Sequence, residues 1–431
     1  MEAIWNNIKK QKFDPLREDI KTDVLIIGGG LSGLLCAYLL KEAGVSCVLV
    51  EANEICSGIT NGTTAKITIQ HGLIYDKISG KYGEETARKY YESQKSAFEE
   101  LCKLVSGRDC DFEISDSFVY SRIDRKVIEK ETQTLNKIGC KAEFCEKTEL
   151  PFDVLGAVKV PEQANFHPLK FVFSIAKDLP IYENTKILEL KPGFATTANG
   201  KIFADKIIVA THFPFINKHG AYFIKMYQHR SYVLALKNAS KMKGMYVDES
   251  MEGLSFRGYK DLLLVGGGSH RTGNDGGGWT ELERISQRHY PEACEVGRWA
   301  TQDCMTLDSM PYIGKYSKST PDLYVATGFN KWGMTSSMLS AMILTDMLCG
   351  KENEYAELYS PSRSVFHPQL AANALESLKG MLTPTVPRCP HLGCALKYNK
   401  QEHSWDCPCH GSRFSDDGTL IDNPATDGKK I

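Results

Sequence analysis

A strand, a glycine-rich turn and a helix near the N-terminus limit most strongly what this 431-residue chain can fold into. An apolar run over 24–27 leads directly into Gly-Gly-Gly-Leu-Ser-Gly at 28–33, and an apolar helical pattern follows over 34–40. A second apolar run covers 46–50. This order is typical of a parallel βαβ unit, whose Gly-x-Gly-x-x-Gly turn lets a pyrophosphate lie on the helix N-terminus. The sequence therefore predicts an α/β (α+β) fold with a Rossmann-like dinucleotide-binding domain.

Further features indicate which dinucleotide binds. Glu51 ends the second strand, where a carboxylate accepts ribose hydroxyls and disfavours the 2′-phosphate of NADP. Small residues over 57–66 suit backbone that passes close to a flavin. The strand over 323–328 ends in glycine, and we expect a helix to begin near Ser337. The positive end of that helix would face the flavin edge that gains negative charge on reduction. Together these features favour FAD over NAD.

Two cysteine–histidine boxes near the C-terminus carry the pattern of a metal centre. Cys-Pro-His-Leu-Gly-Cys begins at Cys389, and Cys-Pro-Cys-His-Gly-Ser begins at Cys407. The spacing fits a Rieske [2Fe–2S] cluster, with Cys389 and Cys407 on one iron and His391 and His410 on the other. A structural zinc also accepts two cysteines and two histidines and is the alternative. A zinc finger, however, usually has a separate histidine half, which this pattern lacks.

The boxes resemble those of Rieske proteins in nearly every position. Cys394 and Cys409 stand where the high-potential members have a disulfide, so the resemblance implies one here, with two free buried thiols as the alternative. Ser412 matches a hydroxyl that donates to a cluster sulfur, whereas Phe414 replaces a donating tyrosine. Fewer hydrogen bonds lower the potential, which we expect below the top of the range of roughly −150 to +300 mV.

Residues 20–355 resemble the glycine oxidase/D-amino-acid oxidase superfamily of FAD-dependent oxidoreductases. The stretches Thr-Thr-Ala-Lys-Ile-Thr-Ile-Gln-His (63–71) and Gly-Phe-Asn-Lys-Trp-Gly-Met-Thr (328–335) are similar to a bacterial branch that ends in a Rieske segment. The resemblance and the glycine turn together imply the following FAD-binding residues: Gly28, Gly30, Leu31, Ser32, Gly33, Glu51, Ala52, Gly58, Thr63, Thr64, Ala65, Ile187, Ala210, Gly328, Trp332, Gly333, Met334 and Thr335.

The chain departs from this family's pattern at three places. Asp303 stands where amino-acid oxidases often carry an arginine for the substrate carboxylate, so an amine or another cation is the expected substrate. The Rieske segment begins almost at its first ligand, and so short a segment needs the cluster and docking for stability. Arg271 replaces the third glycine after Gly-Gly-Gly at 266–268. We therefore expect a loop near the flavin there, and no bound NAD(P)H.

The expected organisation has four parts. A discontinuous FAD-binding domain covers 20–80, 150–215 and 305–350, and a mixed-sheet substrate or cap domain covers 81–149 and 216–304. A helical connector over 351–382 leads to a small all-β Rieske segment over 383–431.

Composition narrows the partners and the location. The formal net charge of −1 gives no reason to expect nucleic acid or an anionic membrane as a partner. No apolar run approaches the 18 or so residues of a membrane span, and the first residues lack the apolar stretch of a signal peptide. Fourteen scattered cysteines are typical of reduced thiols. We therefore expect a cytoplasmic bacterial protein of undetermined oligomeric state.

No catalytic acid or base stands out. His71, His270 and Arg230 are candidates, but a structural role is the alternative for each, and His212 could equally face the flavin. His229 and Tyr259 could also face the flavin, with a structural role as the alternative. Cys304 does not match the position of the cysteine that attaches flavin in some relatives. Flavin oxidation of an amine needs little more than a neutral amine aligned with N5. The absence of an obvious base is thus compatible with an enzyme.

The sequence as a whole predicts an FAD-dependent dehydrogenase that takes hydride from a small amine-like donor. Single electrons would then pass through the cluster to an external one-electron carrier. The first alternative is a reductase in which electrons enter at the cluster and the flavin reduces a substrate. The second is a redox-responsive flavin and iron–sulfur protein without turnover.

Overall fold

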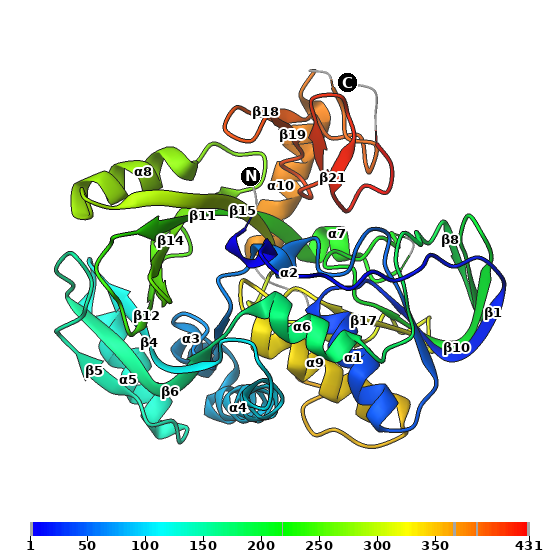
Figure 1. Ribbon diagram of the computed structural model, residues 1–431, viewed down its shortest axis with the longest axis horizontal. Helices are drawn as coiled ribbons and strands as arrows, with labels where there is room; N and C mark the ends of the chain where they lie inside the picture. The colour runs from blue at the N-terminus through cyan, green and yellow to red at the C-terminus, as the bar shows by residue number, and fades with distance from the viewer. Residues whose placement is uncertain (1–2, 218, 365–367, 385–386, 429–431) are drawn as a thin grey trace.

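The computed structural model describes residues 3–217, 219–364, 368–384 and 387–428, and contains three β-sheets (Figure 1). Residues 365–367 of the predicted connector, and 385–386 and 429–431 of the predicted Rieske segment, lie outside the described residues. Within the described part, no helix has the length and apolar character needed to cross a membrane.

The first sheet contains the predicted parallel βαβ unit, with antiparallel pairs β16–β17, β9–β10 and β8–β9 beside the parallel strands. Its main path runs β16-β17-β10-β1-β2-β7, with β1 parallel to both β2 and β10. Val24 and Ile26 pack with the helices on one face, and Leu25 and Ile27 with apolar residues on the other, because side chains alternate along a strand. The strands are β1 (Ile20–Ile27), β2 (Cys47–Val50), β7 (Ile181–Tyr182), β8 (Glu189–Lys191), β9 (Phe194–Thr196), β10 (Lys201–Val209), β16 (Tyr312–Lys315) and β17 (Leu323–Thr327).

Helices α1 (Leu31–Glu42) and α9 (Gly333–Leu348) pack together beside this sheet, and the Ser32 and Ser340 hydroxyls are 2.8 Å apart between them. Helix α9 begins at Gly333, a turn earlier than the sequence predicts. Short elements nearby are η1 (Ile4–Asn6), α2 (Ile59–Gly62), α6 (Pro168–Ala176) and α7 (Tyr222–Lys225).

The second sheet is mixed and has nine strands, in the order β15-β11-β14-β13-β12-β4-β6-β3 with β5 beside β6. Its strands are β3 (Lys66–Ile67), β4 (Glu113–Ser121), β5 (Glu143–Cys145), β6 (Gly156–Asn165), β11 (Met226–Lys237), β12 (Met245–Asp248), β13 (Ser255–Tyr259), β14 (Leu262–Arg271) and β15 (Cys294–Thr306). The helices of this part are α3 (Ile74–Tyr82), α4 (Glu84–Ser106), α5 (Arg125–Lys137) and α8 (Gly278–His289). Strand β6 belongs to this sheet, although 150–215 is expected to be part of the FAD-binding domain. The domain boundaries stay a prediction.

The glycines at 266–268 correct one expectation. They lie inside strand β14, which pairs with β11 and β13, and do not form a loop. A Cβ atom on Gly268, whose φ is +58°, would stand 2.2 Å from the Gly278 carbonyl oxygen at the start of α8. The glycines therefore allow close packing of strand and helix. Gly266 and Gly267 nevertheless line the central cavity described below, as a position near the flavin requires.

The third sheet is small, antiparallel and built from the C-terminal residues that the structure describes. Its strands follow the chain order β18 (Lys397–Asn399), β19 (Ser404–Asp406), β20 (Arg413–Ser415) and β21 (Leu420–Asp422). Helix α10 (Pro368–Leu382) leads into it, and in Figure 1 the sheet lies above α7 and the first sheet. A Cβ atom on Gly380 of α10 would stand 2.5 Å from the Cys409 sulfur, so the helix packs directly on the second cysteine–histidine box.

Candidate redox site

The glycine turn after β1 has the geometry that a bound pyrophosphate requires. Gly28 has φ +114°, and a Cβ atom there would stand 2.5 Å from the Ala210 carbonyl oxygen of the neighbouring strand end. A Cβ atom on Gly33 would stand 2.0 Å from the Gly28 carbonyl oxygen. The turn therefore brings backbone close to the N-terminus of α1, where an anion is favoured.

Glu51 lies at the end of β2 beside this turn. Its carboxylate accepts hydrogen bonds from the backbone N–H groups of Gly29 at 2.7 Å and Asn53 at 2.9 Å. Burial raises the pKa of Glu51, and these two hydrogen bonds partly offset the shift. The carboxylate keeps lone pairs for the hydroxyls of a ribose.

A cavity of about 1080 Å³ extends from this turn to the N-terminus of α9. All but three of the predicted FAD-binding residues line it, and its volume suits a dinucleotide with a small substrate. The exceptions are Gly33, which packs against Gly28, Ala65, whose carbonyl accepts from Arg257, and Thr335, which lies behind the wall. The cavity fits FAD, although the single contacts stay predictions.

His71 supports the far end of this cavity. Its Nε2 atom lies 3.0 Å from both the Thr68 carbonyl oxygen and the Thr335 hydroxyl, its Nδ1 atom lies 2.8 Å from the Tyr90 hydroxyl, and its ring stacks on Trp332. Burial lowers the pKa of His71 to about 3, so the imidazole is neutral. The side chain is thus fully engaged in holding the start of α9, which is a positioning role.

The other two catalytic candidates lie outside the cavity wall. Arg230 donates to both carboxylate oxygens of Glu402, and His270 is buried against Tyr232 with Nδ1 3.3 Å from the Gly268 carbonyl oxygen. Neither side chain is among the residues that line the cavity.

Asp303 and Lys331 bring opposite charges to the cavity wall. Burial raises the pKa of the Asp303 carboxyl to about 6, although Lys331 and Arg230 oppose the shift. Burial likewise lowers the pKa of Lys331 to about 8, and its ammonium donates to the Met251 carbonyl oxygen at 2.8 Å. At neutral pH the carboxylate of Asp303 can therefore pair with a cationic ligand.

The histidines predicted to bind iron lie side by side. The ring centroids of His391 and His410 are 4.9 Å apart, and the Nδ1 atom of each is buried without a hydrogen-bond partner among the described residues. Orphaned buried nitrogens are rare, and metal ligation would satisfy both. A hydrogen bond from the Cys389 thiol lowers the pKa of the Cys407 thiol well below its usual value. This donor set fits a two-cysteine, two-histidine centre.

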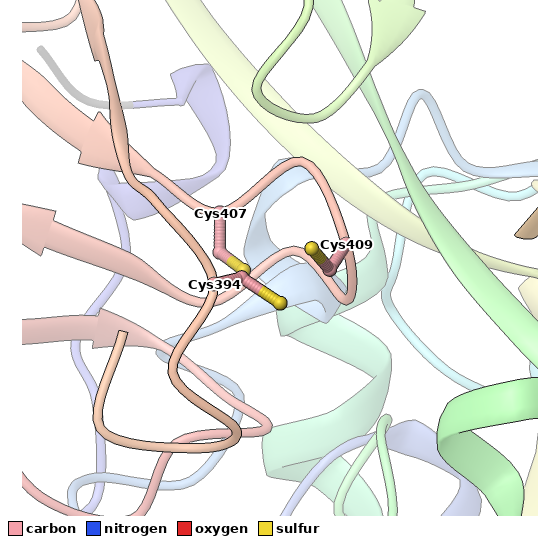
Figure 2. Close-up of side chains that lie close together, drawn as sticks. All are labelled: Cys394, Cys407 and Cys409. Carbon is pink, nitrogen blue, oxygen red and sulfur yellow. The ribbon is translucent and has the colours of Figure 1, made fainter. Parts of the chain in front are cut away.

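The sulfur atoms of Cys394, Cys407 and Cys409 lie within 4.8 Å of one another (Figure 2). Cys394 and Cys409 thus flank a predicted ligand, one from each box. Both are free thiols in this structure, so the disulfide implied by the resemblance stays a prediction.

The histidine side of the boxes faces the flavoprotein part of the chain. His391 Nε2 lies 3.0 Å from Asn217 Oδ1, and Phe223 meets His391 and His410 edge-on at 6.5 and 6.0 Å. Gln228 Nε2 donates to the His410 carbonyl oxygen at 3.0 Å. Asn217 and Phe223 lie on the segment that leaves β10, whose end lines the cavity.

A buried ion network fixes the same contact. Glu402 accepts from Arg230 of β11, from Arg413 of β20 at 2.8 Å and from the Tyr232 hydroxyl at 2.9 Å. The side chains of Arg230, Glu402 and Arg413 are 4%, 9% and 5% exposed. Charges this deeply buried need such pairing. Nothing in the sequence around Glu402 distinguishes it from a surface carboxylate, so sequence reasoning missed it.

Arg257 is a second functional residue that the sequence did not indicate. Its guanidinium is buried and donates to the Thr64 and Ala65 carbonyl oxygens and to Asn165. Among the described residues no carboxylate pairs with it in an ion bridge. Arg257 thereby fixes the loop over 63–65, of which Thr63 and Thr64 line the cavity.

Comparisons with known proteins agree with this geometry. A family model described as "FAD dependent oxidoreductase" (DAO) matches residues 23–347, and one described as "Rieske [2Fe-2S] domain" matches 360–430. These matches confirm the predicted fold class, FAD and a [2Fe–2S] centre, and they decide against the zinc alternative.

Two known proteins and one solved structure are similar to this chain over most of its length. The Rieske 2Fe-2S iron-sulfur protein YhfW of Bacillus subtilis is 33% identical over 98% of this chain and 96% of its own. Gamma-glutamylputrescine oxidoreductase of Escherichia coli is 23% identical over 80% of this chain and 88% of its own. The crystal structure of glycine oxidase from Geobacillus kaustophilus superimposes with a TM-score of 0.66, at 18% identity, over 80% of this chain and 99% of that one, which shows the shared fold.

Proposed function

The chain belongs to the FAD-dependent oxidoreductase (DAO) family and carries a Rieske [2Fe–2S] domain, and we propose that it oxidises a small amine-like donor and delivers the electrons singly to an external acceptor. FAD supplies a two-electron hydride acceptor, and the cluster supplies a one-electron carrier. The residues of the chain hold these groups next to each other and select the donor.

The docking of the cluster ligands carries this proposal. Asn217 and Phe223 contact His391 and His410, and they lie on the segment that directly follows the cavity-lining end of β10. The short chain path from the cavity wall to the histidines supports electron exchange within one chain.

Asp303 supports an amine-like donor. Its carboxylate lies in the cavity wall where the related amino-acid oxidases often place an arginine, and a carboxylate attracts an ammonium group rather than a substrate carboxylate. The name of the Escherichia coli relative, gamma-glutamylputrescine oxidoreductase, also points to an amine as the donor. His71 keeps the start of α9 in place, so that the positive helix end faces the cavity.

An anaerobic screen tests the proposal. Amines, amino acids and hydroxy acids are mixed with the holoprotein while flavin and cluster absorbance are followed separately. We expect an amine to bleach the flavin first and the cluster second. Flavin reduction only by carboxylate donors that lack an amine would contradict the donor class.

The direction of electron flow has its own test. In a stepwise redox titration, a flavin potential below that of the cluster supports oxidation of the donor. The reverse order would favour the reductase alternative.

A further inference from the structure

The last part of the Rieske domain lines the same cavity as the nucleotide-binding loops. Residues 417–423 and 425–428 stand in its wall, together with 185–187 and 210–212 of the flavoprotein part. The ends of parallel strands such as β10 are where this kind of sheet binds its dinucleotide. The cavity wall is therefore composite, although the family model for the FAD domain ends at residue 347.

Asn423 anchors this C-terminal segment to the nucleotide-binding side. Its side-chain amide donates to the Thr211 carbonyl oxygen at 2.9 Å and to the Phe213 carbonyl oxygen at 2.8 Å. Its own carbonyl oxygen accepts from Gln228 at 2.8 Å. Asn423 thus holds the loop that follows Ala210, one of the predicted FAD contacts.

Two more contacts connect the segment to both cofactor regions. Lys186, next to the predicted FAD-binding residue Ile187, donates to the Thr426 carbonyl oxygen. The backbone N–H of Ala425 donates to the Ser412 hydroxyl at 3.0 Å, within the second cysteine–histidine box. One short stretch therefore contacts both the nucleotide-binding side and the cluster box.

His212 provides an independent sign that the wall is built for a ligand. Its Nε2 atom is shielded from solvent and has no hydrogen-bond partner among the described residues, and the residue lines the cavity with φ +64°. Burial lowers the pKa of His212 to about 4, so the ring is neutral and offers one acceptor or donor.

We infer that the segment over 417–428 of the Rieske domain forms the outer wall of the FAD site, so that FAD binding and docking of the Rieske domain stabilise each other. This coupling is reciprocal by thermodynamic necessity. It goes beyond the proposed function, because it holds for either direction of electron flow and for any donor.

Asn423→Asp tests the inference in the full chain. The substitution keeps the size of the side chain, removes both donated hydrogen bonds and places a carboxylate against two carbonyl oxygens. We expect the Kd for FAD, measured by reconstitution of deflavinated protein and quenching of flavin fluorescence, to rise at least tenfold. Asn199→Asp, at an exposed turn outside the cavity, adds the same charge and should leave the Kd unchanged. An unchanged Kd for Asn423→Asp, with the cluster spectrum intact, would overturn the inference.

A measurement on the unaltered protein covers the case in which the variant fails to fold. Amide hydrogen exchange is compared between FAD-loaded and deflavinated protein, both with the cluster present. We expect FAD to slow exchange over 417–428 at least tenfold, with little change over 125–137 in α5, none of whose residues lines the cavity. Equal exchange over 417–428 in both forms refutes the composite site.

Discussion

Glu402→Gln should release the Rieske domain from the flavoprotein part. Glu402 is 9% exposed and is shared by Arg230 and Arg413, so the substitution leaves two buried guanidinium groups with one carboxylate fewer. Breaking a buried pair from one side costs about 3–5 kcal/mol. Asp422 and Asp406 still contact the two arginines, which favours the lower end, about 3 kcal/mol. At about 1.4 kcal/mol for each factor of ten, the undocked population should rise roughly 100-fold.

Amide hydrogen exchange over 397–422 reports that population. Glu129→Gln is the matched control, because Glu129 also pairs with an arginine, Arg125, at 2.7 Å, but with both side chains 40% or more exposed. An exposed pair contributes about 0–1 kcal/mol, so the control should change exchange less than about fivefold. Burial raises the pKa of Glu402, but Arg230 and Arg413 outweigh it and hold the pKa below 4.5. Docking of the unaltered protein should therefore weaken only as the pH falls below about 4.5. Equal exchange in Glu402→Gln and Glu129→Gln refutes the reasoning.

Four further predictions address the cavity and the cluster. Because the pKa of Asp303 is about 6, KM for an amine donor should fall as the pH rises through 6. Asp303→Asn should raise KM roughly tenfold and abolish this pH dependence. A pH-independent KM in the unaltered protein would contradict the role of Asp303. The same raised pKa means that ionised Asp303 destabilises the fold above pH 6, so Asp303→Asn should have a higher Tm than the unaltered protein at pH 8 but not at pH 4. His391→Ala should remove the visible spectrum of the cluster while donors still bleach the flavin in excess FAD, and loss of flavin reduction under those conditions would refute two separable centres. Gly28→Ala should abolish FAD retention, because its Cβ atom would stand 2.5 Å from the Ala210 carbonyl oxygen, and normal flavin content in the purified variant would show that the turn tolerates a side chain.

Local patterns made much of the site predictable. The strand before Gly28, the glycine spacing and Glu51 are contiguous in the sequence, and such short-range patterns determine the βαβ unit directly. The cysteine–histidine boxes are equally local, since His391 and His410 each belong to a ligand pair of fixed spacing. Fold class and both cofactors follow from these segments.

Long-range contacts account for what the sequence did not indicate. Arg230 and Glu402 are 172 positions apart, and neither lies in a motif, so their pairing depends on how the Rieske domain docks. Three consecutive glycines at 266–268 are typical of a loop, but here they lie in strand β14, where Gly268 packs closely against the start of α8. Histidine is a common catalytic residue type, but both ring nitrogens of His71 lie within hydrogen-bond distance of protein groups, Nδ1 of the Tyr90 hydroxyl and Nε2 of the Thr335 hydroxyl. Such outcomes depend on partners that lie far away in the sequence.

Electron exchange within one chain is the central claim, and flash photoreduction of the flavin under anaerobic conditions tests it most directly. The holoprotein is followed at a flavin wavelength and a cluster wavelength at several protein concentrations. We predict that flavin reoxidation and cluster reduction share one first-order rate constant that does not change with protein concentration. A rate that rises in proportion to concentration, or a cluster that stays oxidised while the flavin is reduced, would contradict the account.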